Sequence, residues 1–381
     1  MTEAPVEKFG IEAVRARQYV AKEVAPRAAQ IDQSQIFPDQ LVQSLGSQGW
    51  LGAALPEQWG GGGLDPIAYG QVVEEFGWGC SSTRTLLTVH NMSAQAILRF
   101  GNTGQKEKYL PALASGQSII AFALTEPEAG SDANALEAVA HECDGGYRVT
   151  GTKVWCSFGA VSDLFLLFAV CAGKPLALIV NRASSGLSIE GMPDCFGTRG
   201  SMLAKLRLDE VFVPTDNRIG AVGAGIKFVA NAALDHGRFS VACGTVGIIR
   251  ACLDACTDYA LKRSQGGSVI AQHQLVRRVL TEGLLAYTSA RALCERSARL
   301  RSENSPKAAA ETALAKYHAA EAAIRIANEA IALHGANGCS PDHPVSRYLR
   351  DATVSGIIEG TREIHQISLA SYALQRPWSD A

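Results

Sequence analysis

The stretch Ile226–Ser264, IKFVANAALDHGRFSVACGTVGIIRACLDACTDYALKRS, decides the fold of this 381-residue chain. Apolar residues recur along it at helical spacing from end to end, which predicts one unusually long amphipathic helix. Two more long, Ala-rich stretches of the same period follow, at residues 271–303 and 308–335. Helices of this length pack side by side, so the chain from about residue 224 onward is predicted to be a helical bundle.

The sequence changes character twice upstream of this bundle. Residues 8–118 carry helical spacing, interrupted by a four-glycine loop, whereas residues 118–223 consist of short runs such as DLFLLFAVCAG and AKLRLDEVFVP. Those runs are rich in Val, Leu, Ile and Phe and are bounded by Gly, Pro, Asp and Ser, which is typical of strands in a sheet pair or barrel. We therefore expect a mainly α fold with a β domain: a helical domain over 1–118, a β barrel or sandwich over 119–223 and a four-helix bundle over 224–381.

Charge and cysteine content exclude several classes of protein. The 35 Lys and Arg residues nearly balance the 37 Asp and Glu residues, so no basic stripe for nucleic acid is expected. Ten Cys residues are scattered without a C-x-x-C pair, which favours reduced thiols over a metal site or disulfides. The first residues lack the apolar core of a secretion signal, and no run of about 18 apolar residues predicts a membrane span. A soluble, cytoplasmic protein without metal, membrane or nucleic-acid partners is the expectation.

Two glycine-rich stretches could suggest a phosphate-binding loop, but neither has the required pattern. Gly60–Gly63 is not followed by Lys-Ser or Lys-Thr, so the P-loop geometry is missing. GAVGAG at 220–225 has the wrong spacing for a dinucleotide fingerprint and does not follow a strand-turn unit. Nucleotide binding of the P-loop or Rossmann type is therefore not expected.

The stretch FALTEPEAGSD at 122–132 offers polar groups at the end of an expected strand. The loop that starts at Thr125 presents backbone N–H groups and the Ser131 hydroxyl, a combination that can hold an anion or the polar edge of a ring. Trp155 and Ser157 stand two apart on the next expected strand, where side chains two apart share a face. An aromatic ring and a hydroxyl on one face suit a flat heteroaromatic cofactor, although ordinary core packing of the Trp explains the same pattern.

Two arginines and one glutamate remain as candidates for chemistry. Arg238 and Arg263 could clamp a phosphate bidentately or could be ordinary solvated helix residues. Glu359, in SGIIEGTREIHQ at 355–366, follows apolar residues and precedes Gly-Thr. A carboxylate in an apolar pocket has a raised pKa and can act as a base near neutral pH, but the same stretch could cap a surface helix.

Taken together, these segments resemble an acyl-CoA dehydrogenase over nearly the whole chain. The resemblance rests on LTEPEAGSD, GTKVWCS, RLDEVFVP, ALDHGRFSVACGTVGIIRACLDACTDYALKR, QHQLV, LHGANG and RYLRDATVSGIIEGT, in that order. It implies FAD bound between the β domain and the bundle of a homodimer or homotetramer. The motifs carry over cofactor contacts to Phe122, Leu124, Thr125, Ser131, Trp155, Ser157, Arg263, Gln274, Gly335, Gly338 and Thr361.

The resemblance also implies the reaction. Glu359 would remove the α-proton of an acyl thioester while the flavin N5 accepts hydride from the β carbon, and Ser131, Arg238, Ile358 and Gly360 would contact the substrate. A branch of the family places its base at the position of Gly237, so Glu359 has no rival here. The two isoleucines before Glu359 are expected to form a desolvating wall, and Arg263 is expected to reach the FAD of a neighbouring subunit.

The chain departs from the family pattern at two FAD positions. Gly266 stands where a Phe is common, and Ala332 stands where many members have Gln, so contacts to the adenosine must differ. A narrower resemblance, in GRFSVACGTVGIIRAC, KVWCS and IIEGTREI, is to the dehydrogenases that act on carrier-protein-bound acyl groups in polyketide extender-unit synthesis of the hydroxymalonyl or methoxymalonyl type. It implies a short, polar acyl thioester on an acyl carrier protein or CoA, and an electron acceptor such as an electron-transfer flavoprotein. A flavin-dependent oxidase or monooxygenase, or a non-catalytic thioester-binding homologue, are the alternatives.

Overall fold

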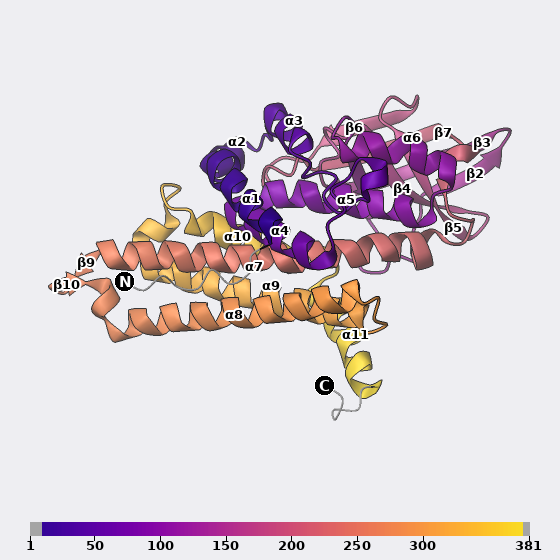
Figure 1. Cartoon of the computed structure of the whole chain (residues 1–381). Coiled ribbons are helices and arrows are strands. Elements are labelled where there is room, and N and C mark those ends of the chain that lie inside the picture. Colours follow the sequence, from indigo (N-terminus) through magenta and orange to yellow (C-terminus); the bar gives the residue numbers. More distant parts are fainter. Residues whose placement is uncertain (1–9, 376–381) are drawn as a thin grey trace.

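A computed structural model describes residues 10–375, and it has the expected order of helices, sheet and long-helix bundle (Figure 1). The change from helix to strand lies between Ala114 and Ile120, and the helices resume at Gly225. The expected three-part, mainly α architecture is thus confirmed, while the domain limits at 118 and 223 stay predictions.

The N-terminal part is built from helices with two short helical irregularities. A π-helical turn and a 3-10 turn join the first two helices, and Pro26 lies inside the second of these turns. The elements are α1 Ile11–Tyr19, η1 Val20–Val24, η2 Ala25–Arg27, α2 Ala28–Ser34, α3 Asp39–Ser47, η3 Glu57–Trp59, α4 Pro66–Gly79, α5 Ser81–Phe100 and α6 Thr103–Ala114.

The four glycines at 60–63 form a loop after η3, as expected. All four of their N–H groups donate to carbonyls of the same loop region, at Glu57, Pro56, Gly52 and Leu55. Because no N–H remains free to face an anion, this loop does not cradle a phosphate.

The middle part is one eight-stranded sheet folded over its own core. The strand order is β6-β7-β3-β2-β4-β5-β8, with β1 parallel to β4. A single residue pair, Val139 with Val170, joins β2 to β4, so the sheet bends there and side chains of β3, β4, β5 and β7 meet in one cluster. The strands are β1 Ile120–Ala123, β2 Val139–Cys143, β3 Gly146–Cys156, β4 Leu164–Cys171, β5 Lys174–Asn181, β6 Leu187–Gly191, β7 Ala204–Pro214 and β8 Arg218–Ile219.

The C-terminal part is the bundle that the opening stretch predicts. Helix α7 runs antiparallel to α8 and is joined to it by a small hairpin, and α9 lies beside both (Figure 1). The elements are η5 Gly225–Ala230, α7 Asn231–Lys262, β9 Ser264–Gln265, β10 Ser268–Val269, η6 Ile270–Gln272, α8 Gln274–Ser302, α9 Ala308–His334, η7 Gly335–Cys339, α10 Val345–Ser355 and α11 Arg362–Gln375, while η4 Thr215–Asn217 lies between β7 and β8 of the middle part.

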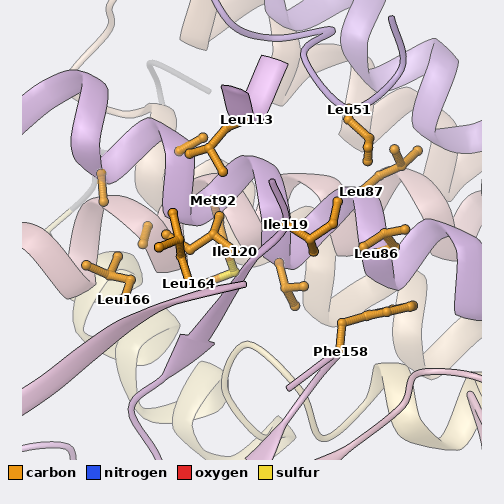
Figure 2. Packing of buried hydrophobic residues seen from close by; sticks show 14 of the residues in the cluster. Leu51, Leu86, Leu87, Met92, Leu113, Ile119, Ile120, Phe158, Leu164 and Leu166 are labelled. Carbon is orange, nitrogen blue, oxygen red and sulfur yellow. The ribbon is translucent and has the colours of Figure 1, made fainter. Parts of the chain in front are cut away.

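A shared hydrophobic core holds α5 against the sheet. Leu86, Leu87 and Met92 of α5 meet Ile120 of β1 and Leu164 of β4 in one buried cluster (Figure 2). Burying such side chains contributes about 1.5–3 kcal/mol each. This packing fixes α5 between the sheet and α7, the position from which it reaches the candidate site.

Gly225–Lys262 is long and apolar enough to cross a membrane, but 78% of its most apolar window is buried inside the protein. It therefore packs as the central helix of the bundle. All ten cysteines are free, and no group of metal-ligating side chains is found in the described residues 10–375.

Candidate active site

Glu359 lies in the short connection between α10 and α11. Its backbone has a φ of 57°, an unusual conformation for a residue other than Gly, Asn or Asp. Its Oε2 atom is shielded from solvent and has no hydrogen-bond partner. Thr361 accepts a hydrogen bond from the N–H of Ile364 and so caps α11, which leaves the Glu359 carboxylate out of the cap.

Gly237 on α7 makes the room that the Glu359 carboxylate occupies. A Cβ atom at this position would lie 2.6 Å from Oε2 and 2.8 Å from Cδ of Glu359. Any other residue at 237 would therefore displace the carboxylate. A carboxylate side chain at position 237 of α7 and the carboxylate of Glu359 would therefore need the same space.

Three cations surround Glu359 without forming an ion pair with its carboxylate. Arg238 Nε donates to the Glu359 carbonyl oxygen at 3.2 Å, and Lys316 Nζ donates to the Gly360 carbonyl oxygen at 2.7 Å. Burial raises the pKa of Glu359 to about 7, because the attraction of Arg238, Lys316 and Arg84 only partly offsets the loss of hydration. Burial also lowers the pKa of Lys316 to about 8. The site thus holds a carboxyl group that exchanges a proton near neutral pH.

A second group of candidate residues lies where β1 ends beside β3. The Val154 N–H donates to the Thr125 carbonyl oxygen at 2.9 Å, which brings Thr125 and Trp155 into neighbouring positions. Leu124 is buried and Phe122 is half-buried, with its ring 5.1 Å from that of Phe168. The predicted ring-binding residues are therefore gathered at one edge of the sheet.

The prediction that Trp155 and Ser157 share a face of one strand is wrong. The register of β3 shifts between Lys153 and Cys156, Trp155 has a φ of 59°, and Ser157 lies beyond the strand end. A β-bulge of this kind re-aims a side chain. As a result the Trp155 indole is 58% exposed, so the core-packing alternative for Trp155 does not hold.

A buried ion pair fixes the loop that follows Leu124. Glu126 and Lys153 are both buried and bonded to each other, and Glu126 also accepts from the N–H groups of Glu137 and Ala138. Lys153 Nζ donates in addition to the Leu124 carbonyl oxygen at 3.1 Å. Ser131 is exposed in this loop, between Glu126 and the N–H groups of Glu137 and Ala138 that bond to it.

The expected wall of two isoleucines before Glu359 is only half correct. Ile358 is half-buried, but Ile357 is 60% exposed and turns away from the carboxylate. Residues of α7 and α5 desolvate Glu359 instead. A Cβ atom at Gly237 of α7 would lie 3.1 Å from Sδ of Met92 on α5, so Met92 closes the space around the carboxylate on that side.

A third group lies at the far end of the bundle. Arg263 ends α7 and Gln274 begins α8, both exposed, and Gly335 and Gly338 lie in η7 close by. Tyr259, near the end of α7, connects this region to the end of α9, because its ring stacks on the ring of His334 with 4.2 Å between the ring centroids.

The distance along α7 separates this third group from Glu359. Arg263 is 26 residues from Gly237, or about 39 Å along the helix. That is longer than one extended FAD molecule. Arg263 and Glu359 of one chain therefore cannot contact the same FAD.

A cavity of about 830 Å³ lies between α4, α5, the start of α7 and the α8–α9 connection, and Glu359 is not one of its lining residues. Arg99, Lys227, Asp235 and Arg301 line it, and Arg301 forms an ion pair with Asp235 at 2.8 Å. Such a volume is in the range of small-ligand sites. The cationic side chains at its wall suit a ligand with an anionic group.

Sequence reasoning missed Arg84 and Lys316, which the fold brings to Glu359 from α5 and α9. The sequence does contain a pattern that could have identified Arg84. Arg84 is the only formally charged residue between Glu75 and Arg99, in a stretch whose apolar spacing predicts a buried helix. Lys316 carried none, because a Lys in an amphipathic helix is normally solvated.

The described residues thus combine a buried carboxyl group with a pKa near neutral pH and an exposed indole at one edge of the sheet. Three family models cover the chain: the N-terminal domain of acyl-CoA dehydrogenase over residues 13–117, the middle domain over 121–211 and the C-terminal domain over 223–374. The chain belongs to the acyl-CoA dehydrogenase family.

Similar proteins agree with this assignment. An acyl-CoA dehydrogenase of Bacillus subtilis (strain 168) is 36% identical over 366 residues, which are 94% of this chain and 96% of that protein. FkbI, described as acting in biosynthesis of the methoxymalonyl extender unit of the Fk520 polyketide, is 32% identical with a TM-score of 0.87, covering 96% of this chain and all of that one. The prolyl acyl carrier protein oxidase AnaB is 28% identical with a TM-score of 0.91, covering 96% and 100%.

The family uses FAD, and the residues at the sheet edge fit its ring system. The exposed Trp155 indole offers a flat apolar face, and the half-buried residues Thr125 and Ser157 carry hydroxyl groups that can hydrogen-bond ring heteroatoms. Bound there, FAD supplies the acceptor for the two electrons of a hydride.

Proposed function

We propose that Glu359 is the base that removes the α-proton of an acyl thioester in this FAD-dependent dehydrogenase. The observation that carries the proposal is the unpartnered Oε2 atom of Glu359, seated in the space that Gly237 leaves and with a pKa of about 7. A base works best when its pKa lies near the working pH. A carboxylate with no partner is also free to accept a proton from carbon.

The surrounding cations have supporting roles in this proposal. Arg238 and Lys316 hold the Glu359–Gly360 backbone through its carbonyl oxygens, and so set the direction in which the carboxylate points. Their charge also keeps the deprotonated form of Glu359 accessible near neutral pH.

The acyl group is proposed to be short and polar and to arrive on the arm of an acyl carrier protein, as an extender unit for polyketide synthesis. The likeness to FkbI and to a carrier-protein oxidase supports this choice. The cavity supports it as well, since Arg99 and Lys227 at its wall suit the phosphate of a phosphopantetheine arm.

The test of the base is the bleaching of flavin absorbance when acyl thioester is added without oxygen. Glu359→Gln is expected to keep FAD and to lose bleaching, whereas Glu363→Gln, a matched change at an exposed glutamate of α11, is expected to keep both. Bleaching at an unchanged rate in the Glu359→Gln protein would remove Glu359 from this role.

The carrier is tested by presenting the same acyl group in two forms. An acyl carrier protein loaded with the acyl group is expected to bleach the flavin at lower concentration than the corresponding CoA thioester. A preference for CoA would instead assign the protein to acyl-CoA oxidation.

A second candidate function is oxidation with oxygen as the acceptor, because AnaB is described as an oxidase. Peroxide formed in step with thioester consumption, with no other acceptor present, would favour it. The dehydrogenase reading expects turnover only with an added acceptor such as an electron-transfer flavoprotein.

We also propose that the protein is cytoplasmic and acts as a homo-oligomer. Leu275, Leu284 and Leu285 of α8 are 75%, 56% and 60% exposed. A second copy of the chain would cover such leucines, and would place its own FAD within reach of Arg263.

A further inference from the structure

We propose that His365 is a positioning residue for Glu359: its imidazole ring supports the turn at Gly360, next to the residue that carries the carboxylate. The inference rests on the proposed function for one point only, the role of that carboxylate as the base. The influence of His365 on the protonation of Glu359 can be measured without any reaction.

The turn that carries Glu359 has a backbone conformation that needs support. Glu359 has a φ of 57° and Gly360 has a φ of 100°, so two consecutive residues lie at positive φ. For a glutamate this conformation is unfavourable, and it persists only where the surrounding structure enforces it. The contacts of the turn therefore decide whether the carboxylate stays in its buried position.

The ring of His365 lies directly against Gly360. His365 is the fourth residue of α11 and is 2% exposed. A Cβ atom at Gly360 would lie 3.2 Å from Nε2 of His365, and 3.6 and 3.7 Å from two of its ring carbons. These are the three atoms nearest to that Cβ position, so the imidazole alone closes this side of the turn. A shorter side chain at 365 would leave a void there.

Two hydrogen bonds hold the same turn at other points. Arg238 Nε donates to the Glu359 carbonyl oxygen, and Lys316 Nζ donates to the Gly360 carbonyl oxygen. Both bonds fix oxygens of the backbone, whereas the Cα of Gly360 is held by the contact with the His365 ring. The ring and the two cations together keep the turn from moving, and with it the Glu359 carboxylate.

His365 is uncharged at neutral pH. Burial and the nearby charges of Lys316 and Arg238 lower the pKa of His365 to about 4, and the carbonyl oxygens of Glu359 and Gly360 oppose this shift only in part. The Nε2 atom is buried and has no hydrogen-bond partner. A charged ring would add one more cation to those that already attract the Glu359 carboxylate, and would lower the pKa of that group. The neutral ring supports the turn without this effect.

Loss of the ring should change the pKa of Glu359 in a defined direction. The charged and titratable groups that face Glu359 are Arg84 of α5, Arg238 of α7, Lys316 of α9 and His365 of α11. Burial influences the pKa of Glu359 more than the attraction of the three cations does. A void beside Gly360 lets the turn relax and lets water approach the carboxylate. The pKa of Glu359 should therefore fall from about 7 toward its ordinary value of 4.5.

The test measures the protonation of Glu359 with no substrate present. The infrared band of the protonated carboxyl group is followed from about pH 5 to 9 in the FAD-loaded protein, and subtraction of the Glu359→Gln spectrum assigns it. The midpoint is expected near pH 7 in the unchanged protein. It is expected to be lower by about 1 pH unit or more in His365→Ala, and lower by a smaller amount in His365→Asn, which removes less volume. His365→Gln, which keeps most of the volume and a neutral polar group, is expected to restore the midpoint.

Tyr372→Phe is the matched control on the same helix. The Tyr372 hydroxyl donates to Glu311 Oε1 at 3.1 Å and so holds α11 to α9 about two helical turns beyond His365. This variant is expected to unfold at lower urea concentration and to leave the titration of Glu359 unchanged. If the His365 variants lose stability in the same way but keep the midpoint near pH 7, His365 is an ordinary packing residue and the inference is overturned.

Flavin bleaching by a saturating thioester separates this inference from the proposed function. In His365→Ala the bleaching rate above the midpoint is expected to fall by on the order of a hundredfold, since a small displacement of the base is costly. His365→Gln is expected to recover most of that rate. If Glu359→Gln bleaches at the normal rate, the proposed function fails, while a shifted infrared midpoint in His365→Ala still supports the positioning role. An unshifted midpoint overturns that role whatever the bleaching shows.

Discussion

At the scale of single residues, two glycines of α7 make the room in which two charged side chains are buried. Gly237 and Gly244 carry no functional group, yet the side chains of Glu359 and Arg84 occupy the volume that a Cβ at each would need. The charges acquire their properties from this close packing, because burial raises the pKa of Glu359 and leaves the Nε and Nη2 atoms of Arg84 without a hydrogen-bond partner.

The pKa of Glu359 predicts how the rate of flavin reduction depends on pH. The deprotonated carboxylate is the active base, so the rate constant should rise with pH through a midpoint near 7 and level off above it. Stopped-flow reduction from pH 5.5 to 8.5, with saturating thioester, measures this. A rate that falls across the same range would show that a protonated group limits the reaction.

Gly237→Ala should slow flavin reduction without loss of FAD. The new Cβ would lie 2.6 Å from Glu359 Oε2, and a displacement of about 1 Å at a reacting group can cost on the order of a hundredfold in rate. Gly191→Ala is the matched control, because nothing lies within 4 Å of a Cβ there. Equal rates in the two variants would contradict the packing argument.

At the scale of elements, the end of β3 decides how the ring-binding residues are presented. The bulge at Trp155 turns its indole outward, and the Lys153–Glu126 pair ties the following loop to the strand. The two features act together, since Lys153 points into the protein while Trp155, two residues later in the bulged segment, does not.

Lys153→Met should destabilise the protein and weaken FAD binding. Removing Lys153 leaves Glu126 buried without its cation, a loss of about 3–5 kcal/mol in the free energy of unfolding. Arg207→Met breaks the exposed pair with Glu190 and should cost less than about 1 kcal/mol. Urea unfolding of both variants and a flavin titration test this, and similar losses in the two would refute the role given to burial.

At the scale of the whole molecule, α10 contacts both the N-terminal helices and the middle sheet, and Glu359 follows directly after it in the chain. Arg350 forms an ion pair with Asp32 of α2, and buried Asp351 accepts from the Thr198 N–H at 2.7 Å, in the connection between β6 and β7. The close approach of Gly197 to the Arg350 carbonyl leaves no room for a side chain. The position of Glu359 therefore depends on the assembly of all three parts.

Replacing Leu284 and Leu285 with Glu should lower both the oligomeric state and the FAD content. If a second copy covers α8, two charges per chain placed in that interface oppose association, and the contact of Arg263 with the neighbouring FAD is lost. Light scattering after size exclusion and the flavin-to-protein absorbance ratio measure the two effects. Ile11→Glu, at a residue that is 85% exposed on α1, should change neither. An unchanged mass in the leucine variant would contradict the proposed interface.

The order of helices, sheet and bundle could be predicted from the sequence because it follows from local periodicity, which each segment carries by itself. The position of Glu359 as a candidate base followed from its apolar neighbours and from family motifs. The face shared by Trp155 and Ser157 was predicted wrongly, because a bulge interrupts the strand alternation and short-range pattern does not reveal it.

The sequence by itself thus determined the architecture and the family, and it named the candidate residues for the cofactor contacts and the base. Only the tertiary structure decided what surrounds Glu359: the cations from α5, α7 and α9 and the glycine that makes room for the carboxylate. The physical reason is that a pKa, a void and an unsatisfied charge depend on distances between segments far apart in the chain, and those distances exist only once the helices have packed.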